Sequence, residues 1–308
     1  MAEAPYIDAR AVDAQAAWTS LRMIRSLLYV PASAERFVAK AHERGADAII
    51  LDLEDAIAPG GKEAARAALT DAAPRVGQAG AAVLVRINSQ PELRDRDALA
   101  ACRAGAIGLL VPKVTTPATL AALADLLAPV ERSLGRAPLR FMPLVEDPGA
   151  VLDARAIAAA PRVFGISAGG EDLATEMDAE PTPDTLRLPK LLVHLAAKAA
   201  GVRSFGMLRS VANYSDTDAI LASAREARAL GFDGASCIHP AVVPLLNEAF
   251  TPSPAALDRA RRMVAAFEAA QAQGLGAFAF DGEMVDLPIV ERARRLIART
   301  GSRPGALE

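Results

Sequence analysis

Two acidic residues stand out because each follows a short apolar run. The run 139–145 leads into Glu146, and the run 163–167 leads across a glycine pair to Asp172. If both runs are parallel strands joined by the helix-like segment 151–159, the two carboxylates share one edge of a sheet. One or two carboxylates are the usual protein ligands of Mg²⁺. The alternative is that both acids are solvated loop residues or helix N-caps, where acids are common.

Composition limits the classes of protein that this chain can belong to. Its 308 residues suffice for one large α/β domain or two small ones, and 52% hydrophobic with 4% aromatic residues predicts an aliphatic core. A net charge of −3 without a basic block argues against nucleic acid or a membrane surface as a partner. The two cysteines, Cys102 and Cys237, have no metal-ligand spacing, so we expect a reducing, cytoplasmic compartment. We expect neither a secretory signal nor a membrane-spanning helix.

Eight short apolar runs predict the strands of a parallel sheet. Most are followed by a segment of helical periodicity, and glycines such as Gly45 and Gly231 mark helix ends. Eight such units fit a (β/α)₈ TIM barrel over residues 25–250, with a doubly wound open sheet as the alternative. Residues 1–24 form an N-terminal extension, and 251–308 a C-terminal helical extension. The runs are 26–30, 48–53, 82–87, 107–111, 139–145, 163–167, 203–208 and 234–238.

Polar or charged residues stand at the carboxyl end of nearly every predicted strand. In a TIM barrel these ends meet at one rim, which is where active sites lie. Any one of them taken alone could be an ordinary loop residue, but the whole set favours an enzyme. The set includes Tyr29, Asp52, Glu54, Asp55, Arg86, Asn88, Lys113, Glu146, Asp172, Arg209 and His239.

An ordered series of motifs resembles the citrate lyase β-chain-like branch of the HpcH/HpaI aldolase/citrate lyase family, which includes malyl-CoA and citramalyl-CoA lyases. The motifs are RSLLYVPASAERFVAKA, ADAIILDLEDAIAP, VRIN, VPK, PLVEDPGAV, GGEDL and GFDGASCIHP. The resemblance runs from Arg25 to about Arg294. It implies a TIM barrel whose C-terminal extension reaches a neighbouring subunit of a homotrimer or hexamer. It also implies a Mg²⁺-dependent lyase that cleaves or forms a 3-hydroxyacyl-CoA from an acyl-CoA and a small 2-oxo acid.

The resemblance assigns the two acids and one arginine to the reacting centre. Glu146 and Asp172 match the metal ligands of the family, and Arg86 matches the arginine that holds the carboxylate of the acid substrate. A guanidinium suits that task because its planar fork can bind a carboxylate through two hydrogen bonds.

A second group of residues matches positions that contact the CoA ester or the rest of the substrate. Tyr29, Arg36 and Lys40 match the positions at the CoA ester, and the last two are four residues apart, on one face of a predicted helix. Ile238 and His239 match a loop that touches the substrate. His239 could equally be a structural loop histidine.

Asp286, in the C-terminal extension, matches an acid that is offered to the next subunit's site. We expect it to be the base that takes the hydroxyl proton in cleavage, and the methyl proton of the acyl-CoA in condensation. Its ordinary pKa is too low for the second task, so burial would have to raise that pKa. The remaining acids, Asp52, Glu54 and Asp55, are expected to order water, the metal or Arg86.

The chain also departs from the family pattern on the predicted substrate side. Ala235 stands where a lysine or arginine is frequent, and Pro189 and Lys190 replace an Ala–Arg pair. Three functions follow from the sequence. The first is a CoA-ester lyase. The second is a CoA-independent keto-acid aldolase, which the CoA-contacting residues disfavour. The third is a non-catalytic or acyl-carrier-binding subunit of a larger lyase complex.

Overall fold

Eight parallel strands form the centre of the first of two compact units, as the apolar runs predict. The structure is a computed structural model that describes residues 23–210 and 214–300, and the units divide after Phe250. Within the sheet each strand pairs with its neighbour in the chain, β8 pairs with β1, and a bridge from Phe205 to Gly234 closes the ring. The strands are β1 (Ser26–Pro31), β2 (Ala48–Asp52), β3 (Ala82–Arg86), β4 (Gly108–Val111), β5 (Arg140–Val145), β6 (Gly165–Ala168), β7 (Arg203–Phe205) and β8 (Ala235–Cys237).

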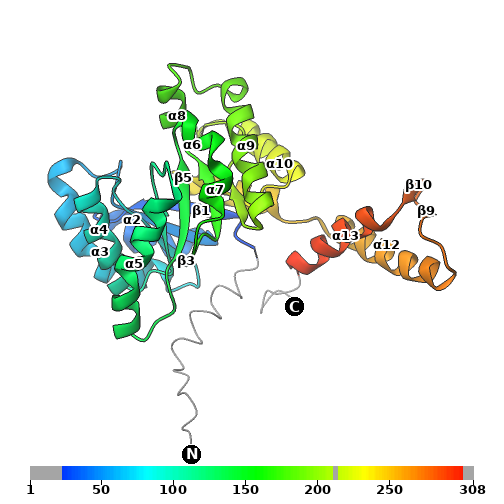
Figure 1. The fold of residues 1–308 in the computed structure, drawn as a ribbon, viewed down its shortest axis with the longest axis horizontal. Coiled ribbons are helices and arrows are strands. Elements are labelled where there is room, and N and C mark those ends of the chain that lie inside the picture. The colour runs from blue at the N-terminus through cyan, green and yellow to red at the C-terminus, as the bar shows by residue number, and fades with distance from the viewer. Residues whose placement is uncertain (1–22, 211–213, 301–308) are drawn as a thin grey trace, which may run out of the picture. The chain divides into compact units, whose positions relative to one another are not determined.

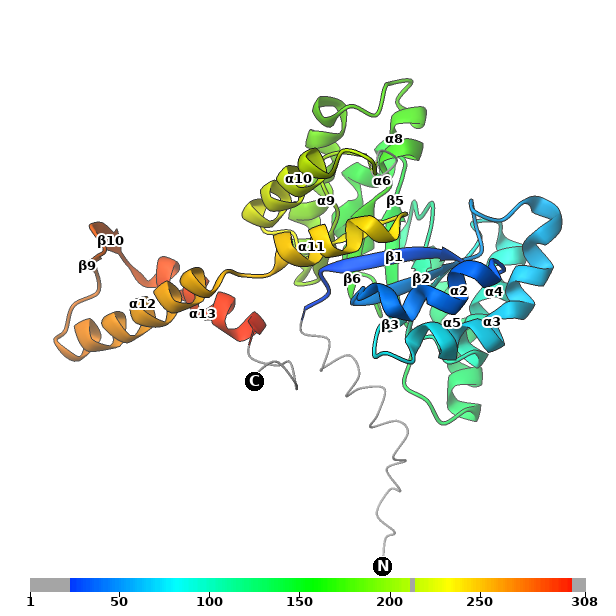
Figure 2. The same cartoon turned by 180° about the vertical axis from the view of Figure 1, so that it is seen from behind.

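Helices alternate with these strands and surround them (Figures 1 and 2). The TIM barrel is therefore the fold of residues 24–250, and the doubly wound sheet is excluded. The helices of this unit are α2 (Glu35–Ala41), α3 (Lys62–Gly77), α4 (Pro91–Arg103), α5 (Pro117–Ser133), α6 (Pro148–Leu152), α7 (Ala154–Ala158), α8 (Gly170–Glu176), α9 (Pro183–Ala200), α10 (Thr217–Leu230) and α11 (Val243–Phe250), with short 3₁₀ turns at His42–Arg44, Pro59–Gly61 and Pro240–Val242.

Two details of the helices bear on the sequence predictions. The helical turn ending at Gly45 and helix α10 ending at Gly231 both stop in the left-handed region, with φ of 70° and 100°, as predicted. The segment predicted as one helix over 151–159 is instead two short helices, α6 and α7. They meet at Asp153, whose backbone (φ −94°, ψ 6°) leaves the helical conformation.

The middle of most strands is apolar because both faces of the barrel strands are buried. All five residues of β2 are buried, and Ile49, Ile50 and Leu51 have no exposed surface. The register then aligns the strand ends. Asp52 of β2 pairs with Pro31 of β1 on one side and with Arg86 of β3 on the other. The residues that follow these positions therefore lie side by side at the carboxyl-terminal rim of the barrel.

The second unit, residues 251–300, has a small core of its own. It consists of α12 (Pro254–Ala272), the antiparallel pair β9 (Phe278–Phe280) and β10 (Glu283–Val285), and α13 (Leu287–Thr300). Phe267, Val285 and Val290 are buried in this core, and Phe278 packs against it. Most of the apolar residues of the tail thus stabilise the tail itself, while the Met284 side chain stays 68% exposed.

Two further predictions concern the ends of the chain and membranes. The N-terminal extension over residues 1–24 lies, apart from its last two residues, outside the described part of the chain. No helix among residues 23–210 and 214–300 is long and apolar enough to cross a membrane.

Candidate metal and carboxylate site

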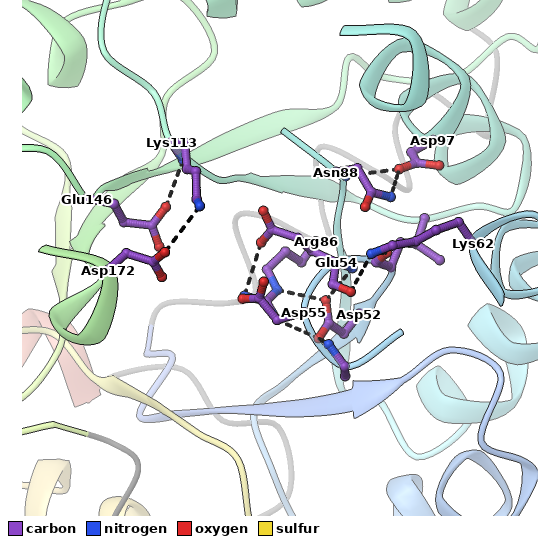
Figure 3. Close-up of polar contacts among 12 residues, drawn as sticks. Asp52, Glu54, Asp55, Lys62, Arg86, Asn88, Asp97, Lys113, Glu146 and Asp172 are labelled. Carbon is purple, nitrogen blue, oxygen red and sulfur yellow. Dashed lines mark hydrogen bonds and ion pairs between the residues drawn. The ribbon is translucent and has the colours of Figure 1, made fainter. Parts of the chain in front are cut away.

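Glu146 and Asp172 lie together at the barrel rim. Glu146 directly follows β5, and Asp172 lies in the first turn of α8, just after β6. Lys113, which follows β4, contacts both of them (Figure 3). Its backbone N–H donates to Glu146 Oε2 at 2.8 Å, and its Nζ lies 3.2 Å from Asp172 Oδ1. Three consecutive strands therefore contribute to one cluster.

The backbone of Lys113 is held in an unusual conformation at this cluster. Its φ is 51°, in the left-handed region, which costs a residue with a Cβ about 1–2 kcal/mol. In this conformation its N–H donates to the Glu146 carboxylate. Non-glycine residues in this region are concentrated at functional sites, where the surrounding structure maintains them.

Gly169 leaves the space that the Glu146 carboxylate occupies. A Cβ at this position would lie within 3 Å of the Glu146 carboxylate, so a side chain there would have to displace that carboxylate. Burial raises the pKa of Glu146 to about 7, although the hydrogen bond from the Lys113 backbone opposes the shift. The carboxylate is thus held in a tight, poorly hydrated position where a cation would stabilise its charge.

Arg86 forms a second cluster at the end of β3. Its Nε and Nη2 donate to the two oxygens of Asp52, at 2.7 and 2.6 Å, in a bidentate pair. Its Nη1 donates to Asp55 Oδ2 at 2.8 Å and lies 3.2 Å from Glu54 Oε2. The guanidinium also lies over the Tyr29 ring, 4.9 Å from its centroid. Residues from β1, β2 and β3 therefore fix the orientation of Arg86.

The electrostatics of the two clusters are coupled. Burial raises the pKa of Glu54 to about 8, with Arg86 opposing the shift and Glu146 among the charges that add to it. Burial also raises the pKa of Tyr29. Counting both clusters, five carboxylates (Asp52, Glu54, Asp55, Glu146 and Asp172) face two side-chain cations (Arg86 and Lys113). A bound cation would stabilise the ionised form of these carboxyl groups, two of which have a raised pKa without it.

The donor set fits a hard divalent cation that keeps open coordination positions. Among the residues that the structure describes, no group of three or more His, Cys, Asp or Glu side chains could enclose a metal. A pair of carboxylates, Glu146 and Asp172, is the arrangement by which Mg²⁺ is commonly held, with water or substrate oxygens as the other ligands. The site thus suits a metal that also binds the substrate, and not a structural metal.

A supporting network of hydrogen bonds fixes the loops that follow β2 and β3. Lys62 Nζ donates to the carbonyl oxygens of Leu53 and Glu54, at 2.9 and 2.6 Å. Asp97, with no exposed surface, accepts from the backbone N–H and the side-chain amide of Asn88, at 2.9 and 2.6 Å. Figure 3 shows these residues beside the Arg86 cluster. The two hydrogen bonds between Asn88 and Asp97 therefore fix the loop after β3.

The other predicted residues lie apart from these contacts. Arg36 and Lys40 are exposed on α2, as their spacing requires. Ile238 is 46% exposed after β8. His239 caps the 3₁₀ turn Pro240–Val242, where its Nδ1 accepts from the Ala241 N–H at 3.2 Å. Its contact with a substrate stays a prediction.

Asp286 lies in the second unit, at the start of α13. Its carbonyl oxygen accepts the N–H groups of Ile289 and Val290, at 3.2 and 3.1 Å. Its role in catalysis therefore stays a prediction.

Sequence reasoning named one contributor to the rim without its contacts and missed two others. It named Lys113 as a rim residue but gave no sign of its contacts to both acids. It did not single out Asp97, whose partner Asn88 is nine residues away across a turn. It also missed Tyr214, whose ring stacks on His239 with centroids 4.6 Å apart. For Tyr214 the only available signal was an aromatic residue in a polar loop.

Comparison with known proteins identifies the family. The family model described as HpcH/HpaI aldolase/citrate lyase matches residues 25–240. The chain belongs to this family. The chain is 37% identical over 281 residues to a (3S)-malyl-CoA thioesterase of Cereibacter sphaeroides, covering 89% of this chain and 94% of that one. It is 32% identical over 284 residues to the citrate lyase subunit beta of Escherichia coli, covering 90% and 93%.

Solved members of the HpcH/HpaI family have the same fold. The chain resembles the protein CitE of Mycobacterium tuberculosis in complex with magnesium, acetoacetate and coenzyme A, with a TM-score of 0.74 and 32% identity. That comparison covers 92% of this chain and all of the other. The citrate lyase beta subunit of the same organism, complexed with oxaloacetate and magnesium, has a TM-score of 0.64 and 30% identity over 76% of this chain. The family resemblance and the TIM barrel inferred from sequence are both confirmed.

Proposed function

We propose that this protein is a Mg²⁺-dependent carbon–carbon lyase that interconverts a 3-hydroxyacyl-CoA with an acyl-CoA and a 2-oxo acid. The observation that carries the proposal is the pair Glu146 and Asp172 beside Arg86 on one barrel rim, with more carboxylates than side-chain cations around them. Mg²⁺ with CoA and a small keto acid in a solved relative supports the same reading. The family resemblance points to malyl-, methylmalyl- or citramalyl-CoA as the substrate.

The residues of this chain divide the work of binding. Glu146 and Asp172 would hold the metal, which, when bound, acidifies the substrate hydroxyl and orients it. Arg86, already fixed by Asp52 through two hydrogen bonds, would hold the carboxylate of the acid substrate. Because Asp52 fixes the guanidinium before substrate arrives, little conformational entropy is lost on binding. Arg36 and Lys40, exposed on α2, would meet the phosphates of CoA.

The proposed cleavage needs one base and one stabilised leaving group. The base removes the proton of the 3-hydroxyl group, and the O–H electron pair forms the carbonyl of the 2-oxo acid. The bond between C2 and C3 breaks, and its electrons form the enolate of the acyl-CoA thioester, which then takes a proton at C2. We assign the base to Asp286 of a second copy in a homotrimer or hexamer. After it has taken the hydroxyl proton, its protonated carboxyl group would donate that proton to C2 of the enolate.

A second candidate function is hydrolysis of the thioester. Relatives 36–37% identical to this chain are named (3S)-malyl-CoA thioesterase. A metal held by the same two carboxylates, Glu146 and Asp172, could polarise the thioester carbonyl for attack by water. Hydrolysis would release free CoA and a hydroxy acid, whereas cleavage of the carbon–carbon bond leaves the thioester intact. The products therefore separate the two functions.

The test is an assay of both product types with the purified full-length chain. A panel of 3-hydroxyacyl-CoA esters is supplied with Mg²⁺ or with EDTA, and 2-oxo acid and free thiol are measured in parallel. We expect 2-oxo acid without free thiol, and loss of activity in EDTA and in the Glu146→Gln and Asp172→Asn variants. Free thiol without 2-oxo acid would show a thioesterase. Activity on hydroxy acids that lack CoA would show the aldolase, and absence of any turnover would favour the non-catalytic or carrier-binding subunit.

A further inference from the structure

Lys190 is a buried cation that the proposed reaction does not use. Among the described residues it is the one lysine that is buried, with 6% of its surface exposed. Its Nζ donates to the carbonyl oxygens of Met207, at 3.0 Å, and Arg209, at 2.8 Å. Burial lowers the pKa of this amine to about 8, with Glu171 opposing the shift. A charge that is costly to bury persists where it is satisfied by specific partners.

Both carbonyl groups belong to the segment that leaves the rim after β7, residues 206–210. This segment begins at Gly206, whose φ of 142° lies in a region that favours glycine. A second tie holds its other end, because the Ser210 hydroxyl donates to the carboxylate of Glu171. Glu171 lies in the first turn of α8, next to the proposed metal ligand Asp172.

The amine of Lys190 also lies against the first residue of α8. A Cβ on Gly170 would lie 3.2 Å from Lys190 Nζ and 3.4 Å from its Cε, so the lysine end packs directly on this glycine. One side chain, 17 and 19 residues before its two carbonyl partners, thus contacts both the β7 segment and the start of the helix that carries Asp172. A covalent role is disfavoured, since two hydrogen bonds and burial keep the amine from attacking a carbonyl substrate.

We propose that Lys190 is a positioning residue that ties residues 206–210 to the first turn of α8 and thereby fixes Asp172 for metal binding. The part that concerns the metal rests on the function proposed above. The tie between the two segments is independent of it. Residues that orient metal ligands from outside typically change metal affinity by about 10–100-fold when they are replaced.

The experiment compares Lys190→Met with Lys198→Met, a matched control on the same helix. Lys198 lies two turns further on, is exposed, and pairs with Asp233 at 2.6 Å. Two readouts are taken without substrate: the Kd for Mn²⁺, a probe for the divalent cation, and backbone hydrogen–deuterium exchange in residues 168–176 and 206–210. We expect Lys190→Met to weaken Mn²⁺ binding about 10–100-fold and to speed exchange in both segments. We expect Lys198→Met to change neither.

Separate outcomes bear on the tie and on the metal. Unchanged exchange and unchanged Mn²⁺ affinity in folded Lys190→Met would overturn the proposal. So would trapping of Lys190 by borohydride in the presence of a 2-oxo acid, because that result would make it a reactive amine. If Lys190→Met does not fold, Lys190→Gln, which keeps two N–H donors without the charge, takes its place and must show the same two changes in weaker form. If the wild-type protein binds no Mn²⁺, the proposed function fails, while faster exchange in both segments would still establish the tie.

Discussion

At the scale of single residues, Arg86 shows how the fold prepares a group before substrate binds. Asp52 accepts hydrogen bonds from Nε and Nη2 of Arg86, and the carboxylates of Asp55 and Glu54 lie beside Nη1. A lysine at this position would keep the charge but lose the planar fork. We therefore predict that Arg86→Lys raises the KM for the 2-oxo acid in condensation about 10–100-fold, the loss of one hydrogen bond to a charged group. The KM for the acyl-CoA should change little.

Steady-state kinetics with each substrate varied in turn measure this effect. The carboxylate assignment is contradicted if both KM values rise equally, or if only the KM for the acyl-CoA rises. An Asp55→Asn variant is a useful comparison, because it removes the charge of an exposed partner of Arg86 and leaves the bidentate pair with Asp52 in place.

The side chain of Lys113 competes with a metal for Asp172, one of the two proposed ligands. Its ammonium group lies 3.2 Å from Asp172 Oδ1, where it neutralises part of the charge that a metal would use. An entering divalent cation has to displace this ammonium or bind beside it. We predict that Lys113→Met lowers the Kd for Mn²⁺, since the competing charge is removed while the N–H of residue 113 still reaches Glu146. Titration calorimetry of this variant and of Lys198→Met tests the sign, and weaker binding would contradict it.

At the scale of secondary-structure elements, the turn between β6 and α8 positions Glu146 and Asp172, the proposed metal ligands. Gly169 leaves no room for a side chain beside Glu146, whereas a Cβ at Gly60 would meet nothing within 4 Å. We predict that Gly169→Ala displaces the Glu146 carboxylate and weakens Mn²⁺ binding at least about tenfold, with a matching loss of turnover. Gly60→Ala, the control, should bind Mn²⁺ as the wild type does. Equal affinities in the two variants would contradict the prediction.

Helix α9 carries a pH dependence of stability through Lys190. Its pKa is about 8 in the folded protein and 10.5 ordinarily, so between these values the unfolded chain holds a proton that the folded chain has released. The free energy of unfolding therefore rises with pH in this window. The destabilisation that comes from burying the charged amine is fully present below pH 8. We predict that the unfolding free energy of the wild type, relative to Lys190→Met, increases between pH 8 and pH 10 by about 2 kcal/mol.

Urea unfolding of both proteins at several pH values in this range checks the prediction. Groups common to the two proteins cancel in the difference. A difference that stays constant or falls as the pH rises would show that the amine is not desolvated as its burial indicates.

The same elements show what sequence can and cannot reveal about this protein. The strands were predictable because a strand buried on both faces is a continuous apolar run, and β2 is the clearest case. The rim residues were predictable because they directly follow those runs. The partners of Lys190 were not, since they lie 17 and 19 residues away and are backbone carbonyl groups, which leave no side-chain pattern. The left-handed backbone conformation of Lys113 could not be predicted from the sequence either, because lysine has no preference for it.

At the scale of the whole molecule, the two units differ in what they could supply to an active site. The barrel, residues 24–250, holds the proposed metal ligands Glu146 and Asp172 together with Arg86, and the second unit holds Asp286. That second unit has its own core around Phe267, Val285 and Val290. A unit with its own core can keep its structure when it serves a barrel other than its own. Exchange of such an element between copies is an economical way to build a closed oligomer.

If the tail serves another barrel, the active site is shared between subunits, and mixing two inactive variants should restore activity. Asp286→Ala and Glu146→Gln should each be inactive, because one lacks the proposed base and the other a proposed metal ligand. When the two are mixed under conditions of subunit exchange, some sites receive an intact barrel from one chain and an intact tail from another. Random assembly in a cyclic oligomer gives about a quarter of sites both intact parts.

A second mixture serves as the matched control for this experiment. Glu146→Gln and Asp172→Asn both affect the barrel, so no exchange of tails can restore a complete metal pair in either chain. We expect activity to return only in the mixture that contains Asp286→Ala, in parallel with subunit exchange followed by mass spectrometry of isotopically labelled chains. If exchange is complete and that mixture stays inactive, Asp286 either serves its own barrel or has no catalytic role. An active Asp286→Ala protein on its own would leave the assignment of the base to this residue untenable.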